Sequence, residues 1–261
     1  MPRYSPGCHE HGQNYLTDHA VIRRITNLVH ATDGPIVEIG PGRGAITLPL
    51  TRLDRPLTAI DIDAANVREL RRIVPGDVTV IHHDFLAFHL PQRPHVIVGN
   101  LPFHLTTAIL RKLLHSPGWT EAILLVQWEV ARRRARIGGA SMTTAQWEPW
   151  FDFALDRKVS AESFVPRPGV DGGLLLIRRR DQPLLPRGQR KPYQGLVHRV
   201  FTSKGRGLGE ILERSRALPD KDSVTQFLAR HNLRRTSLPK DIPAHAWVEL
   251  FANRNHKRSA P

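Results

Sequence analysis

The amino-acid sequence is poor in several features that mark whole classes of protein. Its 261 residues include one cysteine, Cys8, so an intrachain disulfide is excluded and a reducing compartment is favoured. No apolar run reaches the roughly eighteen residues of a transmembrane helix, and the N-terminal stretch lacks the apolar segment of a signal peptide. No repeat period is visible, which excludes solenoids and propellers. We therefore expect a cytoplasmic protein without membrane association.

Acidic residues are scarce relative to basic ones. The chain has 38 Lys and Arg against 24 Asp and Glu, a formal net charge of +14. Such an excess favours a polyanionic partner, because basic side chains neutralise phosphates and release their counterions. The alternative is a surface that is merely solubilising. A hydrophobic content of 40% over this length suffices for one full-sized domain and a smaller one.

Short runs rich in Val and Ile alternate with amphipathic stretches from residue 35 onward. This alternation predicts strand–helix units and a mostly parallel sheet. The Pro- and Gly-rich connection "SAESFVPRPGVDGG", residues 160–173, is expected to be an ordered loop or hairpin. The predicted strands are 36–39, 57–61, 78–82, 96–99, 122–127, 153–159 and 172–180, and the predicted helices are 19–30, 45–53, 64–73 and 106–114.

The sequence pattern changes after a basic linker, residues 177–192. Leu, Phe and Trp then recur at helical spacing, with Gly, Pro and Ser between the apolar stretches. We expect two domains, an α/β domain over residues 1–180 and a small all-helical domain over residues 181–261 that ends in a basic tail. The predicted helices of the second domain are 193–201, 208–214, 224–231 and 244–252.

Glycines and acids stand where the first three predicted strands end. In "VEIGPGRGAIT", residues 37–47, alternate glycines would let the backbone come into contact with a ligand at the carboxyl edge of the sheet. Asp61 ends the next strand, where a carboxylate can accept both hydroxyls of a ribose. Asp84 follows the third strand and could accept the amino group of an adenine. The alternatives are a tight turn for the glycines and helix caps or surface charges for the acids.

The fourth strand ends in "GNLPF", residues 99–103, which suits neither strand nor helix. Asn100 offers a side-chain carbonyl, and Leu101, which precedes Pro102, offers a backbone carbonyl with no helix to use it. Two converging acceptors would hold an exocyclic amine by both hydrogens and favour a pyramidal, more nucleophilic nitrogen. Phe103 would then stack on the base. The alternative is an Asn-x-Pro turn beside a core aromatic.

Seven segments together resemble the ribosomal RNA adenine dimethyltransferase family, over residues 13 to about 177. They are "QNYLTD" (13–18), "VEIGPGRGAIT" (37–47), "AIDID" (59–63), "HDFL" (83–86), "GNLPFHLTT" (99–107), "LLVQWEVARR" (124–133) and "SFVPRPGVDGG" (163–173). The resemblance implies a Rossmann-like class I methyltransferase domain with a mostly parallel seven-stranded sheet. It also implies S-adenosylmethionine as the cofactor and methyl transfer to adenine N6, with no metal and no covalent intermediate.

The resemblance assigns roles to particular positions. Asp61 matches the ribose acid, although the family usually has Glu there, and the shorter side chain would need a water or a backbone shift. Phe164 matches an aromatic on the other face of a flipped base, with a core plug under the Pro-rich loop as the alternative. The expected cofactor-binding residues are Gln13, Asn14, Leu16, Glu38, Gly40, Gly42, Gly44, Asp61, Ile62, Asp84, Phe85 and Asn100. The expected catalytic residues are Asn100, Leu101, Pro102, Phe103 and Phe164.

The "NLPF" form, the short helical C-terminal domain and the basic tail resemble the erythromycin-resistance (Erm) branch, which modifies one adenine of 23S ribosomal RNA. The alternatives are the branch that modifies two adenines of 16S ribosomal RNA, a non-catalytic RNA-binding relative, and a DNA or protein-glutamine methyltransferase. A monomer is expected. The "CHEH" tract, residues 8–11, has metal-ligand types but is expected to be a disordered arm.

Four basic clusters are expected to contact RNA phosphates, with a solvated face as the alternative for each. They lie at residues 132–136, 178–180, 187–191 and 203–207. The residues expected to bind RNA are Arg132, Arg133, Arg134, Arg136, Arg178, Arg179, Arg180, Arg190, Lys191, Lys204 and Arg206.

Overall fold

The computed structural model describes residues 14–255, which form two compact units. Unit 1 comprises the chain up to residue 131 together with residues 154–178, and unit 2 comprises residues 132–153 together with the chain from 179 onward. The division differs from the expected boundary after residue 180, because residues 132–153 pack with the C-terminal helices. Tyr193 donates its hydroxyl to the Ala145 carbonyl at 2.8 Å, and Arg136 donates to the Ile242 carbonyl at 2.9 Å.

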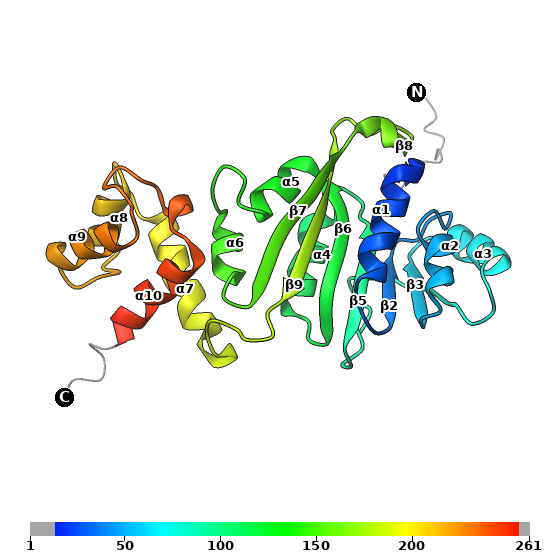
Figure 1. The fold of residues 1–261 in the computed structure, drawn as a ribbon, viewed down its shortest axis with the longest axis horizontal. Coiled ribbons are helices and arrows are strands. Elements are labelled where there is room, and N and C mark those ends of the chain that lie inside the picture. Colours follow the sequence, from blue (N-terminus) through cyan, green and yellow to red (C-terminus); the bar gives the residue numbers. More distant parts are fainter. Residues whose placement is uncertain (1–13, 256–261) are drawn as a thin grey trace, which may run out of the picture. The chain divides into compact units, whose positions relative to one another are not determined.

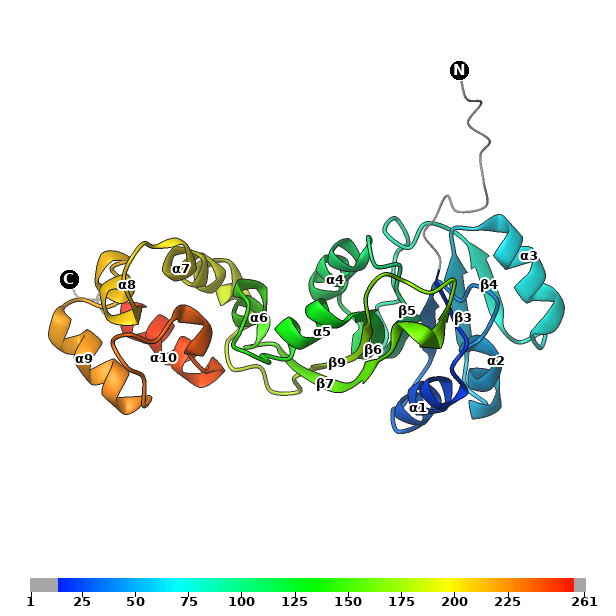
Figure 2. The same cartoon turned by 90° about the horizontal axis from the view of Figure 1, so that it is seen from above.

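A seven-stranded sheet forms the centre of the α/β architecture, in the order β4-β3-β2-β5-β6-β9-β7 (Figures 1 and 2). Strands β2 to β6 pair in parallel, and β9 runs antiparallel to β6. The mostly parallel sheet is therefore confirmed. Its strands are β2 (Ile36–Ile39), β3 (Leu57–Asp61), β4 (Thr79–His82), β5 (His95–Asn100), β6 (Trp119–Gln127), β7 (Phe151–Val159) and β9 (Gly172–Arg179).

Helices cover both faces of the sheet in unit 1, with α1 and α2 on one side and α4 on the other (Figure 2). Asp18 caps the N-terminus of α1 by accepting from the Ala20 and Val21 N–H groups, and Ile25 and Val29 of α1 are fully buried against the sheet. The helices are α1 (His19–His30), α2 (Thr47–Leu50), the 3-10 helix Thr51–Leu53, α3 (Ala64–Ile73), α4 (Thr106–His115) and α5 (Trp128–Arg134).

A second, two-stranded sheet joins the beginning of the described chain to the Pro-rich connection. Strand β1 (Tyr15–Leu16) pairs antiparallel with β8 (Phe164–Val165). Strand β8 directly follows the 3-10 helix Ala161–Ser163. The Ser163 hydroxyl also donates to Asp18 at 2.9 Å. The connection is therefore ordered, and its one short strand pairs with residues 148 or more positions earlier in the chain.

Unit 2 is helical around aromatic side chains, apart from the first residues of β7 and the last residue of β9. Trp247 and Tyr193 are fully buried, and Trp247 stacks on Phe201 with ring centroids 5.9 Å apart. None of the described helices is long and apolar enough to cross a membrane. The helices are α6 (Met142–Trp147), the 3-10 helix Arg187–Gln189, α7 (Arg190–Thr202), α8 (Leu208–Arg214), α9 (Lys221–Arg230), the 3-10 helix Pro239–Asp241 and α10 (Ala244–Asn255).

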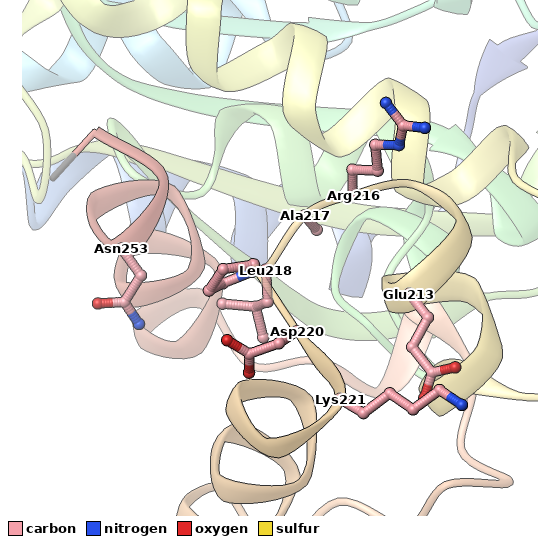
Figure 3. Close-up of a pocket in the computed structure, with 8 residues that line it drawn as sticks. Glu213, Arg216, Ala217, Leu218, Asp220, Lys221 and Asn253 are labelled. Carbon is pink, nitrogen blue, oxygen red and sulfur yellow. The ribbon is translucent and has the colours of Figure 1, made fainter. Parts of the chain in front are cut away.

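A pocket of about 450 Å³ lies between the end of α8, the start of α9 and α10 (Figure 3). It contains none of the residues that the sequence pointed to. Its polar lining residues are Glu213, Arg216, Asp220, Lys221 and Asn253.

Candidate active site at the carboxyl ends of the strands

The glycine loop follows β2 and needs glycine at each of its alternate positions. Gly40, Gly42 and Gly44 have φ values of 64°, 54° and 85°, in the left-handed region that other residues avoid. A Cβ on Gly42 would lie 3.0 Å from the ring of Tyr15. Gly40 donates its N–H to the Ile60 carbonyl of β3 at 2.9 Å, which ties the loop to the sheet edge. The loop is therefore a tight cradle of backbone, in the form expected for close approach by a ligand.

Glu38 lies in β2, two residues before the loop, with only 1% of its surface exposed. Within the described part of the chain, its Oε2 atom is buried without a hydrogen-bond partner. Burial raises the pKa of Glu38 to about 8, the Thr47 hydroxyl lowers it in part, and the Asp61 charge raises it further. A buried carboxyl with an unused oxygen beside the cradle suits a polar or cationic ligand.

Asp61 uses its carboxylate within the protein. It accepts from the Gly42 N–H at 3.0 Å, from the Asp63 N–H at 2.8 Å and from the Asn66 side chain at 3.3 Å, and it is 5% exposed. The shorter side chain at this position therefore anchors the glycine loop to the end of β3. Ile62, the next residue, is 50% exposed and offers an apolar surface beside the loop.

Asp84 begins a single turn after β4. Its carbonyl accepts from the N–H groups of Ala87 and Phe88, both at 3.0 Å, and its Oδ1 accepts from the Leu86 N–H at 2.8 Å. Asp84 is exposed, whereas Phe85 is buried and anchors the turn. We call residues 84–88 the Asp84 turn. Its exposed carboxylate follows the end of β4, and its contact with an adenine amino group stays a prediction.

Asn100 ends β5 with its side-chain amide in a defined orientation. Its Nδ2 donates to the Asn14 carbonyl at 2.8 Å, and since a carbonyl can only accept, the amide nitrogen must face Asn14. The side-chain oxygen is thereby left to accept from another group. The Leu101 N–H donates to the Leu125 carbonyl of β6 at 2.9 Å, and Pro102 begins the turn into α4. The motif is thus held rigidly between β6 and α4.

The two phenylalanines of the site meet, but only one is accessible. Their ring centroids are 6.3 Å apart with the planes at 73°, an edge-to-face contact. Phe103 is half-buried, whereas Phe164 is 2% exposed and packs in the main core cluster. In this conformation Phe164 is the core plug that the sequence left as the alternative, because β8 pairs it with Leu16 and both belong to the core cluster.

Tyr15 is a site residue that the sequence analysis missed. Its ring lies against Gly42, and the Arg43 guanidinium sits over it at 4.6 Å from the centroid. The hint was an aromatic inside the "QNYLTD" segment. The Asn14 carbonyl contacts Asn100, whereas Leu16 is a buried core residue. Gln13 and the tract at 8–11 lie outside the described residues.

Several arginines expected to bind RNA have structural partners instead of open surroundings. Arg136 makes an ion pair with Glu148 at 2.7 Å, and Arg180 makes one with Asp152 at 2.6 Å. Arg134 donates to the Ser141 hydroxyl at 2.7 Å, and burial lowers its pKa. Buried polar chain atoms need such partners, and a sequence pattern of charges does not reveal them. Two further contacts are Arg178 with Glu121 at 3.8 Å and Arg179 over the Phe151 ring at 4.8 Å.

Other predicted RNA contacts remain accessible. Lys191, Lys204 and Arg206 are exposed, and Arg190 lies over the Trp147 ring at 5.3 Å from the centroid. Arg132 is half-buried and Arg133 is exposed. The clusters at 187–191 and 203–207 are therefore better placed for phosphates than those at 132–136 and 178–180.

The fold and this site together define a class of protein. A mostly parallel seven-stranded sheet carries a glycine loop after β2, acids after β3 and β4, and an Asn-Leu-Pro-Phe turn after β5. This is the arrangement of a Rossmann-like methyltransferase, in which S-adenosylmethionine lies across the strand ends. The residues present fit that cofactor, because the loop is a cradle that a Cβ would fill and Glu38 keeps an unpartnered oxygen.

Comparison with known proteins identifies the family. The family described as ribosomal RNA adenine dimethylase matches residues 8–252. An rRNA adenine N-6-methyltransferase of Corynebacterium diphtheriae is 56% identical over 215 residues, 82% of this chain and 85% of that protein. The mycinamicin-resistance protein MyrB of Micromonospora griseorubida is 44% identical, over 94% of this chain and 78% of that protein. The chain belongs to the ribosomal RNA adenine dimethylase family and is an S-adenosylmethionine-dependent rRNA adenine N6-methyltransferase.

Solved structures agree with this assignment. The crystal structure of the 23S rRNA methyltransferase ErmE matches with a TM-score of 0.83 and 30% identity, covering 92% of this chain and 99% of that one. A dimethyladenosine transferase of Plasmodium falciparum matches with a TM-score of 0.74 at 19% identity, which shows the shared fold.

Proposed function

We propose that the protein methylates N6 of one adenine in 23S ribosomal RNA and so confers resistance to macrolide-type antibiotics. Two named relatives support the substrate and the outcome, a 23S rRNA methyltransferase and a mycinamicin-resistance protein. Phe103 in "NLPF" supports 23S over 16S RNA as well. The observation that carries the mechanism is the Asn100 amide, whose nitrogen donates to Asn14 so that its oxygen is left to accept from another group.

The chemistry follows from two acceptors and one aromatic face. The Asn100 side-chain oxygen and the Leu101 carbonyl accept the two hydrogens of the adenine amine, and Phe103 stacks on the base. S-adenosylmethionine supplies an activated methyl group on a sulfonium, so the protein mostly has to position the two reactants in line. The adenine must leave its stack to reach the site, which is cheapest from a loop or bulge.

The charge distribution supports different roles for the two units, catalysis in unit 1 and RNA binding in unit 2. Unit 2 holds 22 of the 38 Lys and Arg but nine of the 24 Asp and Glu, whereas unit 1 holds 16 basic and 15 acidic residues. Nearly all of the net charge of +14 thus belongs to unit 2. We assign catalysis to unit 1 and most of the phosphate contacts to unit 2. The protein acts in this scheme as a cytoplasmic monomer.

The test is methyl transfer by Asn100→Ala. Removing one of the two acceptors lowers kcat by about 100-fold, by analogy with loss of one donor from an oxyanion hole. Binding of S-adenosylhomocysteine, measured by calorimetry, weakens by about tenfold at most, since one neutral hydrogen bond is all that can be lost there. Equal transfer rates in mutant and wild type would refute the mechanism.

The substrate is tested separately with the wild-type protein. Purified protein, labelled cofactor and naked 23S or 16S RNA are incubated, and the methylated nucleotide is mapped by reverse-transcription stops. A single stop in 23S RNA is the expected result. Stops at two neighbouring adenines of 16S RNA would assign the protein to the small-subunit branch instead.

A further inference from the structure

Helix α4 carries a lysine that contacts the Asp84 turn. The Lys112 ammonium donates to the Leu86 carbonyl at 2.9 Å and to the Phe88 carbonyl, and it lies 5.2 Å from the centroid of the Phe85 ring. Burial lowers the pKa of Lys112, and the nearby Asp84 charge opposes that effect. Two carbonyls and one ring of the Asp84 turn therefore contact a single side chain of helix α4.

The contacts made by Lys112 and those made within the turn have different effects. The hydrogen bonds from the N–H groups of Leu86, Ala87 and Phe88 to Asp84 fix the shape of the turn itself. Only contacts to other elements can fix its position in the site. Hydrogen bonds from a charged donor are worth more than neutral ones, and Lys112 makes two of them to carbonyls of this turn. Together with the buried Phe85, Lys112 thus sets where the Asp84 carboxylate stands relative to α4.

The same helix also supports the Asn-Leu-Pro-Phe turn. The Leu105 N–H donates to the Pro102 carbonyl at 2.9 Å, and the Thr106 hydroxyl reaches that carbonyl at 3.3 Å. Lys112 lies six residues after Thr106, about 9 Å along the helix axis. One rigid helix therefore contacts the turn that follows Asn100 at its start and the Asp84 turn near its end.

We propose that Lys112 is a positioning residue for the adenine of the cofactor. By holding the Leu86 and Phe88 carbonyls, it fixes the Asp84 carboxylate at the distance from the catalytic turn that the bound cofactor requires. Lys112 touches neither reactant. The proposal rests on the proposed role of Asp84 as acceptor of the adenine amino group.

The test compares Lys112→Met with wild type in calorimetric titrations with S-adenosylhomocysteine and with 5′-methylthioadenosine, which has the adenosine part but lacks the amino-acid part. Loss of the charged donors frees the turn, so the dissociation constant of both compounds rises by about tenfold. Methyl transfer measured with saturating cofactor stays within about twofold of wild type, because the Asn100 turn keeps its own contacts. The Michaelis constant for the cofactor rises with the dissociation constant, whereas RNA binding is unchanged.

Two further variants separate positioning from a general structural effect. Arg111→Met, an exposed neighbour on the same helix, binds both compounds as wild type does. Lys112→Arg keeps charge and donors and restores most of the affinity. If Lys112→Met does not fold, Lys112→Gln takes its place, since its single amide group can serve one carbonyl of the two.

The outcomes distinguish this inference from the proposed function. A folded Lys112→Met or Lys112→Gln protein with wild-type dissociation constants overturns the role of Lys112. A drop in transfer at saturating cofactor without any change in binding also overturns it. If wild-type protein binds S-adenosylhomocysteine but Asp84→Ala binds it equally well, the assignment of Asp84 fails first, and that result is visible without any Lys112 variant.

Discussion

Replacing the exposed basic residues of unit 2 is expected to flatten the salt dependence of RNA binding. The variant changes Arg187, Lys191, Lys204 and Arg206 to Gln, four side chains that are exposed. Each phosphate contact contributes about 0.7 to the slope of log K against log salt on single-stranded RNA and about 0.9 on a duplex. If all four make such contacts, the slope falls by about 3. Between 50 and 200 mM salt, that difference amounts to about a 60-fold smaller loss of affinity.

The assay is fluorescence anisotropy with a labelled hairpin from 23S RNA, titrated at five salt concentrations. A matched control changes four exposed arginines of unit 1, Arg52, Arg68, Arg93 and Arg111, to Gln. The two variants lose the same formal charge, so a uniform field of the whole protein would affect them equally. Because unit 1 is close to neutral, we expect the control to shift the slope by less than 1.

Two results would refute this reasoning. An unchanged slope in the unit 2 variant would mean that its basic side chains face only solvent. Equal shifts in both variants would mean that the position of the charge does not matter. Circular dichroism and thermal melting of both variants verify that neither change has unfolded the protein.

Two other predictions concern stability. The free energy of unfolding of Glu38→Gln should rise relative to that of wild type as the pH rises. The pKa of Glu38 in the folded protein, about 8, exceeds the ordinary 4.5, so the contribution of Glu38 to wild-type stability is greatest below pH 4.5 and is lost up to about pH 8. The free energies of unfolding are measured in urea without cofactor at pH 5 and pH 9. The difference between the two proteins should change by up to about 4 kcal/mol between these pH values, and a difference that does not depend on pH contradicts the raised pKa. Gly99→Ala would place a Cβ 2.6 Å from the Ile39 carbonyl oxygen and should cost about 1–3 kcal/mol, whereas Gly76→Ala, with nothing within 4 Å, should be neutral in the same thermal melts. A wild-type melting temperature for Gly99→Ala would contradict the close approach of β2 and β5.

Elements with a strong local pattern were predictable from the sequence. Helices 19–30, 64–73 and 208–214 and strands 36–39 and 57–61 have the predicted bounds. Their apolar periodicity and N-caps such as Asp18 and Asp63 are encoded within a few residues of each element. The strand-end residues were predictable for the same reason, because parallel strands bring their carboxyl ends to one edge.

Elements that depend on distant partners were not predictable. Helix α5 is rich in arginine and the short helix α6 follows it, both without clear periodicity, and Arg136 is half-buried there, bound to Glu148 and to the Ile242 carbonyl. Strands β1 and β8 are two residues each and exist only through their pairing. Such short segments carry no periodic signal of their own.

The sequence by itself determined the α/β architecture, the basic charge and the family, because glycines, strand-end acids and the Asn-Leu-Pro-Phe turn are fixed by local backbone chemistry. Only the tertiary structure decided which arginines remain accessible, that Asp61 is bound to the glycine loop, and that Phe164 lies in the core. It also decided the orientation of Asn100 and the contact of Lys112 with the Asp84 turn. The physical reason is that a side chain's partner is set by packing between residues far apart in the chain, which no local pattern encodes.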